Sequence, residues 1–292
     1  MIPWLKAARI PSQLYLALSL LMGHAIFYQV SGSINWPLVV GFAVLGIFLQ
    51  LYIVFGNDVA DFETDKLNKT STLFSGGSRV LVEQSLSLQQ LKKAHYLMTT
   101  LSLVTGLALA YICQSWELIL LTMIAILLLW MYSYPPVKLS YRGGGEFLQV
   151  IGLGIILPLI AFIGQGGKGI PLGIILSLIP SHLACAIGTS LADEPSDRLS
   201  NKRTFTVILG QGYACLLIAM LQASSLIILL ALNIGVPLLN HMGVLSYFLV
   251  LLLGFLFNIN AKPGNLGMSL KIFLTILYTQ SLIGVNIWNC FV

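Results

Sequence analysis

Charged residues are scarce in this sequence. Only 9% of the 292 residues are charged and 57% are hydrophobic, whereas about 25% of the residues of a soluble domain are charged. So few charges cannot cover the surface of a water-soluble enzyme of this length. The composition excludes a soluble globular enzyme and favours a protein embedded in a lipid bilayer.

Cysteine and histidine are also infrequent, with four residues of each type. They are Cys113, Cys185, Cys215 and Cys290, and His24, His95, His182 and His241. None shows the spacing of a zinc site, a haem-attachment motif or a disulfide framework. We therefore expect neither haem nor zinc, and we expect the cysteines to act as small apolar packing residues.

The hydrophobic residues occur in long blocks. A membrane-spanning helix needs about 20 mostly apolar residues. Nine blocks meet this requirement, at 12–30, 36–56, 90–112, 116–134, 147–165, 170–190, 210–232, 241–258 and 268–288. The connections are too short for a soluble domain. We predict an all-α integral membrane protein, a single domain over residues 1–292 with nine transmembrane helices.

The positive charges lie on one predicted side of the membrane. Of the 15 lysines and arginines, all except Lys168 precede the first block or lie near the connections after the second, fourth, sixth and eighth blocks. Such residues concentrate in cytoplasmic segments. We expect a multi-pass protein of the plasma or inner cell membrane with a cytoplasmic N-terminus. Membrane topology accounts for the net charge of +5, so we expect no nucleic-acid partner.

Acidic residues are few and strongly clustered. Seven of the ten lie in two short segments that end even-numbered blocks: Asp58, Asp61, Glu63 and Asp65, and Asp193, Glu194 and Asp197. Carboxylates close to a membrane are energetically unfavourable and are functional candidates by default. Each cluster could instead be a solvated helix end. Both clusters are predicted to face the cytoplasm.

Helical geometry places most of the first cluster on one face. At about 100° per residue, Asp58, Asp61 and Asp65 fall within roughly 60° of one another. Asn57 extends the same face, whereas Glu63 points away. Like charges at this spacing repel each other, so a compensating cation is expected. Asp193 and Asp197 have the i, i+4 spacing that also puts two carboxylates on one helix face.

Hard oxygen ligands without histidine or cysteine are typical of Mg²⁺, which binds through a few carboxylates and substrate phosphates. Two acidic helix faces that oppose each other across a cavity could hold Mg²⁺ ions that also bind a diphosphate. We therefore predict such a site. Basic residues on the same side suit a diphosphate leaving group, although each could serve only as a topology signal. These residues are Arg79, Lys138, Arg142, Lys202 and Arg203. Lys138 stands out because Pro135-Pro136 and Gly143–Gly145 indicate a defined loop around it.

These motifs resemble those of the UbiA superfamily of membrane prenyltransferases. Asn57-Asp58-x-x-Asp61-x-x-x-Asp65 matches the family motif NDxxDxxxD, and Asp193-x-x-x-Asp197 is similar to the second Asp-rich motif. Tyr134-x-x-x-Lys138 looks like a diphosphate-binding pair of the family, and the segment around Arg9 is similar to its N-terminal entry. The resemblance implies nine helices around a central cavity that opens to the cytoplasm.

The resemblance also implies a role for each residue. The expected Mg²⁺ ligands are Asn57, Asp58, Asp61, Asp65, Asp193 and Asp197. The expected diphosphate-binding residues are Arg9, Asn57, Arg79, Tyr134, Lys138, Arg142 and Lys202. The expected catalytic residues are Asp58, Asp61, Asp65, Lys138, Asp193 and Asp197. The expected partners are a polyprenyl diphosphate, an aromatic acceptor and the lipid bilayer.

The stretch from Tyr132 to Glu146 looks most like the 1,4-dihydroxy-2-naphthoate prenyltransferases of menaquinone biosynthesis. The chain departs from that branch at Thr189-Ser190, at Pro195 between the two aspartates and at Asn201, where glycine is usual. Other UbiA-type acceptors stay open: 4-hydroxybenzoate, homogentisate, a chlorin or haem ring, or a glycerophosphate lipid. An alternative from another class is a cation-coupled transporter, although transporter sites usually lie near the bilayer midplane.

Overall fold

Every regular element in the described part of the chain is a helix. The computed structural model describes residues 2–69, 76–169, 172–231, 262 and 266–291. The elements are α1 (Ile2–Ala7), α2 (Ile10–Ser31), α3 (Trp36–Ala60), α4 (Phe62–Leu67), α5 (Leu88–Ile112), α6 (Glu117–Ser133), α7 (Leu139–Arg142), α8 (Gly145–Val150), the π-helix η1 (Ile151–Ile156), α9 (Leu157–Gly164), α10 (Leu172–Ser190), the 3₁₀ turn η2 (Leu191–Asp193), α11 (Glu194–Leu199), α12 (Phe205–Ala231) and α14 (Leu266–Phe291).

The long helices coincide with the predicted apolar blocks. Seven helical stretches are long and apolar enough to cross a membrane, and α6 is a shorter apolar helix. The block at 147–165 is one continuous stretch made of α8, η1 and α9. The block at 241–258 lies outside the described residues, so the count of nine stays a prediction. The all-helical membrane fold itself is confirmed.

Local sequence sets the ends of several helices. Asn35 precedes α3 and its side chain accepts a hydrogen bond from the Leu38 amide. Ser87 and Gln90 form a reciprocal capping box at the start of α5. Helix α2 ends at Ser31 and is followed by Gly32, whose φ of 69° suits a residue without a Cβ atom. These signals satisfy backbone groups that a helix end would leave unpaired.

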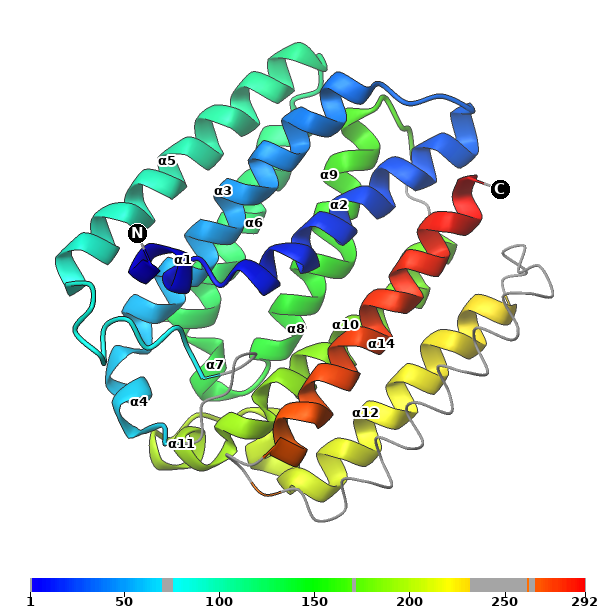
Figure 1. Cartoon of the computed structure of the whole chain (residues 1–292). Coiled ribbons are helices and arrows are strands. Elements are labelled where there is room, and N and C mark those ends of the chain that lie inside the picture. The colour runs from blue at the N-terminus through cyan, green and yellow to red at the C-terminus, as the bar shows by residue number, and fades with distance from the viewer. Residues whose placement is uncertain (1, 70–75, 170–171, 232–261, 263–265, 292) are drawn as a thin grey trace.

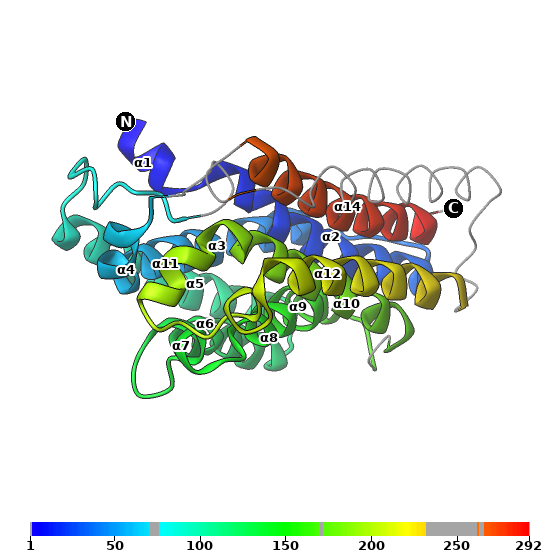
Figure 2. The same ribbon diagram turned by 90° about the horizontal axis from the view of Figure 1, so that it is seen from below.

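The long helices form a ring. In the order α2, α3, α6, α8, α10 and α14, each helix packs against the next, and α14 packs against α2 to close the ring. Helix α5 covers α3 on the outside, and α12 covers α10 (Figure 1). Seen at right angles, the helix bundle is a broad slab and the short helices α4 and α11 lie near the same end of it as α7 (Figure 2).

The opposite end of the ring is filled. Helix α2 packs directly on α9 there, and a Cβ atom on Gly23 would overlap the carbonyl group of Pro158. Leu20, Phe42 and Ile160 are buried in the same apolar core. Among the described residues, α2 and α9 therefore leave no room for a side chain at Gly23.

Candidate active site

A cavity of about 760 Å³ opens between the helices near α4 and α11. Its polar lining includes Arg9, Asn57, Asp61, Asp65, Asn68, Arg79, Asp193, Asp197 and Lys202. Its apolar lining includes Leu16, Leu49, Ile53, Val54, Leu128, Leu153 and Leu157. One cavity thus combines a charged region with a hydrocarbon-like region.

The first acidic motif bends but keeps its face. Helix α3 ends at Ala60, and Asp61 joins it to α4 with non-helical torsion angles. The amide of Asp61 still donates to the Asn57 carbonyl, and the amide of Asp65 donates to the Asp61 carbonyl, both at 2.8 Å. This i to i−4 pattern preserves the predicted alignment of Asn57, Asp61 and Asp65, and all three line the cavity.

Asp58 is covered rather than open to the cavity. Its carboxylate accepts hydrogen bonds from the Arg9 guanidinium group and from the Ser78 hydroxyl. Only 3% of the residue is exposed, and it is not among the lining residues. Arg9 therefore stands between Asp58 and the cavity, and the role of Asp58 as a metal ligand stays a prediction.

The second acidic motif crosses from η2 into α11. Asp193 ends η2 and accepts a hydrogen bond of 2.9 Å from the Asn68 side chain. Asp197 follows in α11, and both aspartates line the cavity. Pro195 lies in the first turn of α11, where its missing N–H leaves no helical hydrogen bond unmade. The departure from the usual sequence therefore does not disturb this motif.

Lys202 joins the two motifs. Its ammonium nitrogen lies 2.9 Å from a carboxylate oxygen of Asp61 and 3.7 Å from one of Asp197. Burial alone would lower the pKa of Lys202, but the two carboxylates outweigh it and raise that pKa. Asn201, just before it, has a φ of 60°, a left-handed conformation that asparagine tolerates and glycine favours.

Asp65 lies beneath a glycine-containing loop. A Cβ atom on Gly77 would overlap the Asp65 carboxylate, and Gly77 has a φ of 74°. The Arg79 guanidinium group donates to the Asn68 carbonyl at 2.7 Å and so ties this loop to the end of α4. Burial, reinforced by Asp61 and Asp58, raises the pKa of Asp65 to about 8.

Three of the expected diphosphate-binding residues do not line the cavity. The Tyr134 hydroxyl donates to the Gly56 carbonyl at 2.8 Å, and its ring stacks near His95. The Lys138 ammonium group lies 3.6 Å from the centre of the Tyr141 ring, and Arg142 is exposed. Their roles in diphosphate binding stay predictions, because none of these three residues lines the cavity.

Sequence reasoning did not single out Tyr141, although it lies in the same loop. Its hydroxyl donates to Asp61 at 3.3 Å and shares a hydrogen bond of 2.8 Å with the Thr64 hydroxyl. Gln50 and Gln149 also line the cavity and were not predicted. Both are polar residues inside apolar blocks, which is the signal that would have found them.

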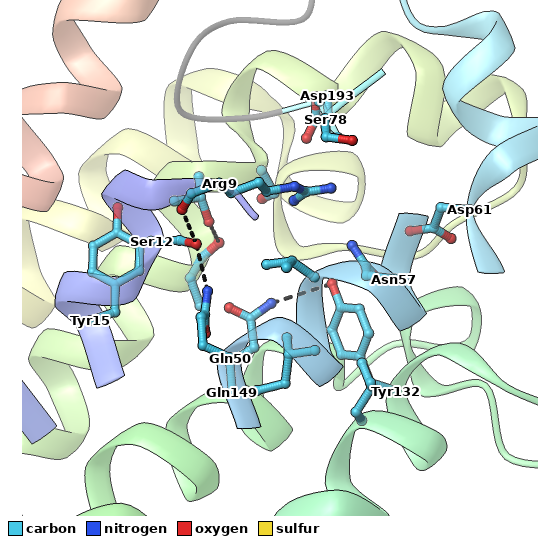
Figure 3. Close-up of a pocket in the computed structure, with 18 of the residues that line it drawn as sticks. Arg9, Ser12, Tyr15, Gln50, Asn57, Asp61, Ser78, Tyr132, Gln149 and Asp193 are labelled. Carbon is cyan, nitrogen blue, oxygen red and sulfur yellow. Dashed lines mark hydrogen bonds between the residues drawn. The ribbon is translucent and has the colours of Figure 1, made fainter. Parts of the chain in front are cut away.

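A second group of polar residues lines the cavity. Gln50 donates to the Ser12 hydroxyl at 2.5 Å, and Gln149 donates to the Tyr132 hydroxyl at 3.3 Å. Figure 3 shows Ser12 beside Arg9 and the Tyr132 hydroxyl beside Asn57. The site therefore holds polar groups that belong to neither acidic motif.

The donor set fits Mg²⁺ shared with a diphosphate. Within the described residues, no group of three histidine, cysteine or acidic side chains is close enough to hold an ion by itself. The cavity instead presents Asp61, Asp65, Asp193 and Asp197 from the two acidic motifs. Mg²⁺ usually keeps one or two protein carboxylates and completes its shell with phosphate and water oxygens.

The helix ring and the two acidic motifs, beside a cavity with charged and apolar walls, define a membrane protein with a polar site at one end of its helices. The family model of the UbiA prenyltransferase family matches residues 16–279. The chain belongs to this family, as the motifs predicted.

Relatives with similar sequences carry related names. The chain is 26% identical over 168 residues to the 2-carboxy-1,4-naphthoquinone phytyltransferase of Synechocystis sp., covering 56% of this chain and 50% of that protein. It is 26% identical over 184 residues to the 1,4-dihydroxy-2-naphthoate octaprenyltransferase of Mycobacterium leprae, covering 61% and 62%. The matches thus span about half and three-fifths of the lengths of these relatives.

Solved structures share the fold. A UbiA homologue from Archaeoglobus fulgidus bound to GPP and Mg²⁺ superimposes with a TM-score of 0.70 at 16% identity, covering 99% of this chain and all of that one. The apo structure of a homologue from Aeropyrum pernix K1 gives 0.69 at 15% identity, covering 94% and 96%. At these identities the likeness shows the fold alone.

Proposed function

We propose that this protein transfers a polyprenyl group from its diphosphate to an aromatic acceptor in a reaction that depends on Mg²⁺. One observation carries the proposal. Aspartates from two separate motifs meet Arg9 and Lys202 at the charged region of a cavity that also has a broad apolar wall. A prenyl diphosphate has the same division into an anionic head and a hydrocarbon tail.

The charged region is suited to the diphosphate. Asp61 and Asp65 from one motif and Asp193 and Asp197 from the other would hold Mg²⁺, with Asn57 as a further oxygen donor. Bound Mg²⁺ supplies Lewis-acid stabilisation of the departing diphosphate. Arg9, Arg79 and Lys202 add fixed positive charge where negative charge develops. We keep the expected roles of four further residues in the proposal, although none of them lines the cavity: Asp58, Tyr134, Lys138 and Arg142.

The apolar region is suited to the prenyl chain. Leu16, Leu49, Ile53 and Leu157 form a surface without hydrogen-bonding groups. Burial of each methylene group contributes about 0.8 kcal/mol. An apolar wall also excludes water from the carbon that the diphosphate leaves, so that the acceptor and not water reacts with it.

The acceptor we favour is 1,4-dihydroxy-2-naphthoate. Both relatives named above are prenyltransferases of naphthalene-type rings, and the Tyr132–Glu146 stretch resembles that branch. Hydroxybenzoate, homogentisate, chlorin or haem, and glycerophosphate lipid acceptors remain the alternatives to be tested beside it. The basic residues near the cavity mouth support a cell-membrane protein whose active site faces the cytoplasm.

A transfer assay tests the proposal. The full-length protein in lipid nanodiscs is given radiolabelled geranylgeranyl diphosphate and a panel of these acceptors, with Mg²⁺ or EDTA. We expect product with Mg²⁺, none with EDTA, and at least a 100-fold loss in Asp61→Asn. Glu63→Gln is the matched control, because Glu63 is 80% exposed in the same segment. Absence of both transfer and Mg²⁺-dependent diphosphate binding in the wild type would overturn the proposal.

A further inference from the structure

Glu146 is a buried carboxylate that neither acidic motif includes. It is 4% exposed, lies in α8 and lines the cavity. Within the described part of the chain, no lysine, arginine or histidine is within ion-pair distance of it. An isolated buried carboxylate is energetically unfavourable and calls for a specific role.

The position of Glu146 is fixed from two sides. One carboxylate oxygen accepts a hydrogen bond of 2.7 Å from the Phe205 amide at the start of α12. The preceding Gly145 is buried, and a Cβ atom there would lie 2.8 Å from the Tyr132 ring. The chain therefore approaches Tyr132 closely at this point, and the Glu146 backbone lies next to that ring.

Gln149 adds a second polar side chain from α8 to the cavity wall. It follows Glu146 by three residues on the same face of α8, and its side-chain amide donates to the Tyr132 hydroxyl. All three residues line the cavity. Figure 3 shows Tyr132 and Gln149 pointing into the space near Asn57 and Asp61. The site is thus adjacent to the charged region.

We propose that Glu146 binds the hydroxyl group of the acceptor and removes its proton, while Tyr132 and Gln149 orient the acceptor ring. This inference rests on the proposed function and assigns a catalytic residue to it. A carboxylate without a cation is a hydrogen-bond acceptor only. It selects a ligand that donates a proton, and a phenol or hydroquinone has such a group beside its nucleophilic carbon.

The reaction balances as follows. The acceptor O–H proton moves to Glu146, and the oxygen electrons make the neighbouring ring carbon nucleophilic. That carbon forms a bond with C1 of the prenyl chain, and the C1–O electron pair leaves with the diphosphate. The attacked carbon then loses its proton to the diphosphate, or loses a carboxyl group as CO₂, and the ring regains its aromatic electrons. Glu146 returns its proton to the ring oxygen.

A simpler role for Glu146 is to hold α12 through the Phe205 amide. Glu146→Gln separates the two roles, because a glutamine carbonyl still accepts that hydrogen bond but does not take a proton. General-base catalysis contributes about 100-fold to 10,000-fold. We expect Glu146→Gln to lower transfer by at least about 100-fold, with Mg²⁺-dependent prenyl diphosphate binding unchanged. Glu117→Gln, at an exposed site on α6, is the control.

Two further measurements make the test specific. The loss in Glu146→Gln should shrink with fluorinated acceptors, whose hydroxyl groups are more acidic and need the base less. On the wild type, the O-methyl ether of the acceptor should compete at least about tenfold more weakly than the acceptor itself, because the ether cannot donate to the carboxylate. The second measurement holds even if the variant does not fold.

The outcomes separate this inference from the proposed function. A wild type that transfers, beside a Glu146→Gln variant that transfers equally fast, overturns the role of Glu146 alone. So does an ether that binds as well as the acceptor, or a variant whose acceptor-free hydrolysis of the prenyl diphosphate falls as much as transfer does. A wild type that neither transfers to any acceptor nor binds the prenyl diphosphate with Mg²⁺ overturns the proposed function and this inference with it.

Discussion

The ammonium nitrogen of Lys202 lies 2.9 Å from a carboxylate oxygen of Asp61, although 141 residues separate them in the chain. This contact joins the loop before α12 to the C-terminal end of α3. Lys202 supplies positive charge between the two acidic motifs, whose carboxylates lie near each other. Lys202 therefore serves both the fold and the proposed diphosphate site.

Replacement of Lys202 should destabilise the metal-free protein. Removing one partner of a buried ion pair leaves carboxylates without their cation and costs about 3 kcal/mol. We expect Lys202→Met to lower the free energy of unfolding by about this amount in EDTA, and Mg²⁺ with diphosphate to restore part of it. Lys66→Met removes an exposed lysine paired with Glu63 and should change little. Equal stability of the two variants would contradict this account.

Mg²⁺ affinity should rise with pH. Burial, Asp61 and Asp58 disfavour the charge of Asp65 and raise its pKa to about 8. Below that pH the proton must leave before an ion binds, so affinity should fall by up to tenfold for each pH unit. The metal-free fold itself should lose stability as the pH rises from about 4 to about 8, because the folded state holds this proton more tightly than the unfolded state does.

Titration of Mg²⁺ and a diphosphate analogue at several pH values, by calorimetry, checks this expectation. Asp65→Asn removes the titrating group and should flatten the pH dependence, with a lower affinity at high pH. A wild-type affinity that is constant between about pH 6 and pH 9 contradicts the assignment of this proton to the metal site.

Gly77→Ala should reduce transfer activity. The added methyl group would overlap the Asp65 carboxylate and also has to accept a left-handed backbone, so the loop must move. Gly166→Ala is a matched control, because Gly166 also has positive φ but has open space around it. Both variants should lose about 1 kcal/mol of stability from backbone strain. Only Gly77→Ala should raise the KM for the prenyl diphosphate; an equal rise in both would count against a close-fitting loop.

The two tyrosines of the α6–α7 region should behave differently. Tyr141→Phe removes a hydroxyl that contacts Asp61, and we expect about a tenfold loss of prenyl diphosphate affinity. Tyr134→Phe removes a hydroxyl that binds the Gly56 carbonyl away from the cavity, and we expect about 1 kcal/mol of destabilisation with little change in affinity. Radiolabelled-donor binding and thermal unfolding measure the two effects. The reverse result would place Tyr134 in the site.

Much of the fold could be predicted from the sequence, because the formation of a membrane-spanning helix depends on residues that are neighbours in the chain. The block at 36–56 is apolar except for Gln50, and Asn35 caps the helix through the Leu38 amide. The spacing of Asn57, Asp61 and Asp65 fixed their common face for the same reason, since i to i−4 hydrogen bonds continue through the bend. Family membership followed from these motifs and is confirmed.

The remaining parts of the site depend on contacts between distant segments. Asn68 meets Asp193 across 125 residues, and Glu146 meets the Phe205 amide across 59. Neither pairing has a spacing that a reader of the sequence can recognise. Arg9 was expected at the diphosphate, but its contact with Asp58 arises from how α1 and α2 cross α3. Such contacts are set by helix packing and not by local pattern.

The close contact of Gly23 with Pro158 also bears on leakage across the membrane. It brings α2 and α9 together, and buried leucine, isoleucine and phenylalanine side chains pack in the apolar core beside it. Hydrocarbon offers water and ions no replacement for their hydration. We therefore expect this part of the bundle to resist the passage of ions, so that a polar site can lie in a membrane that maintains a voltage.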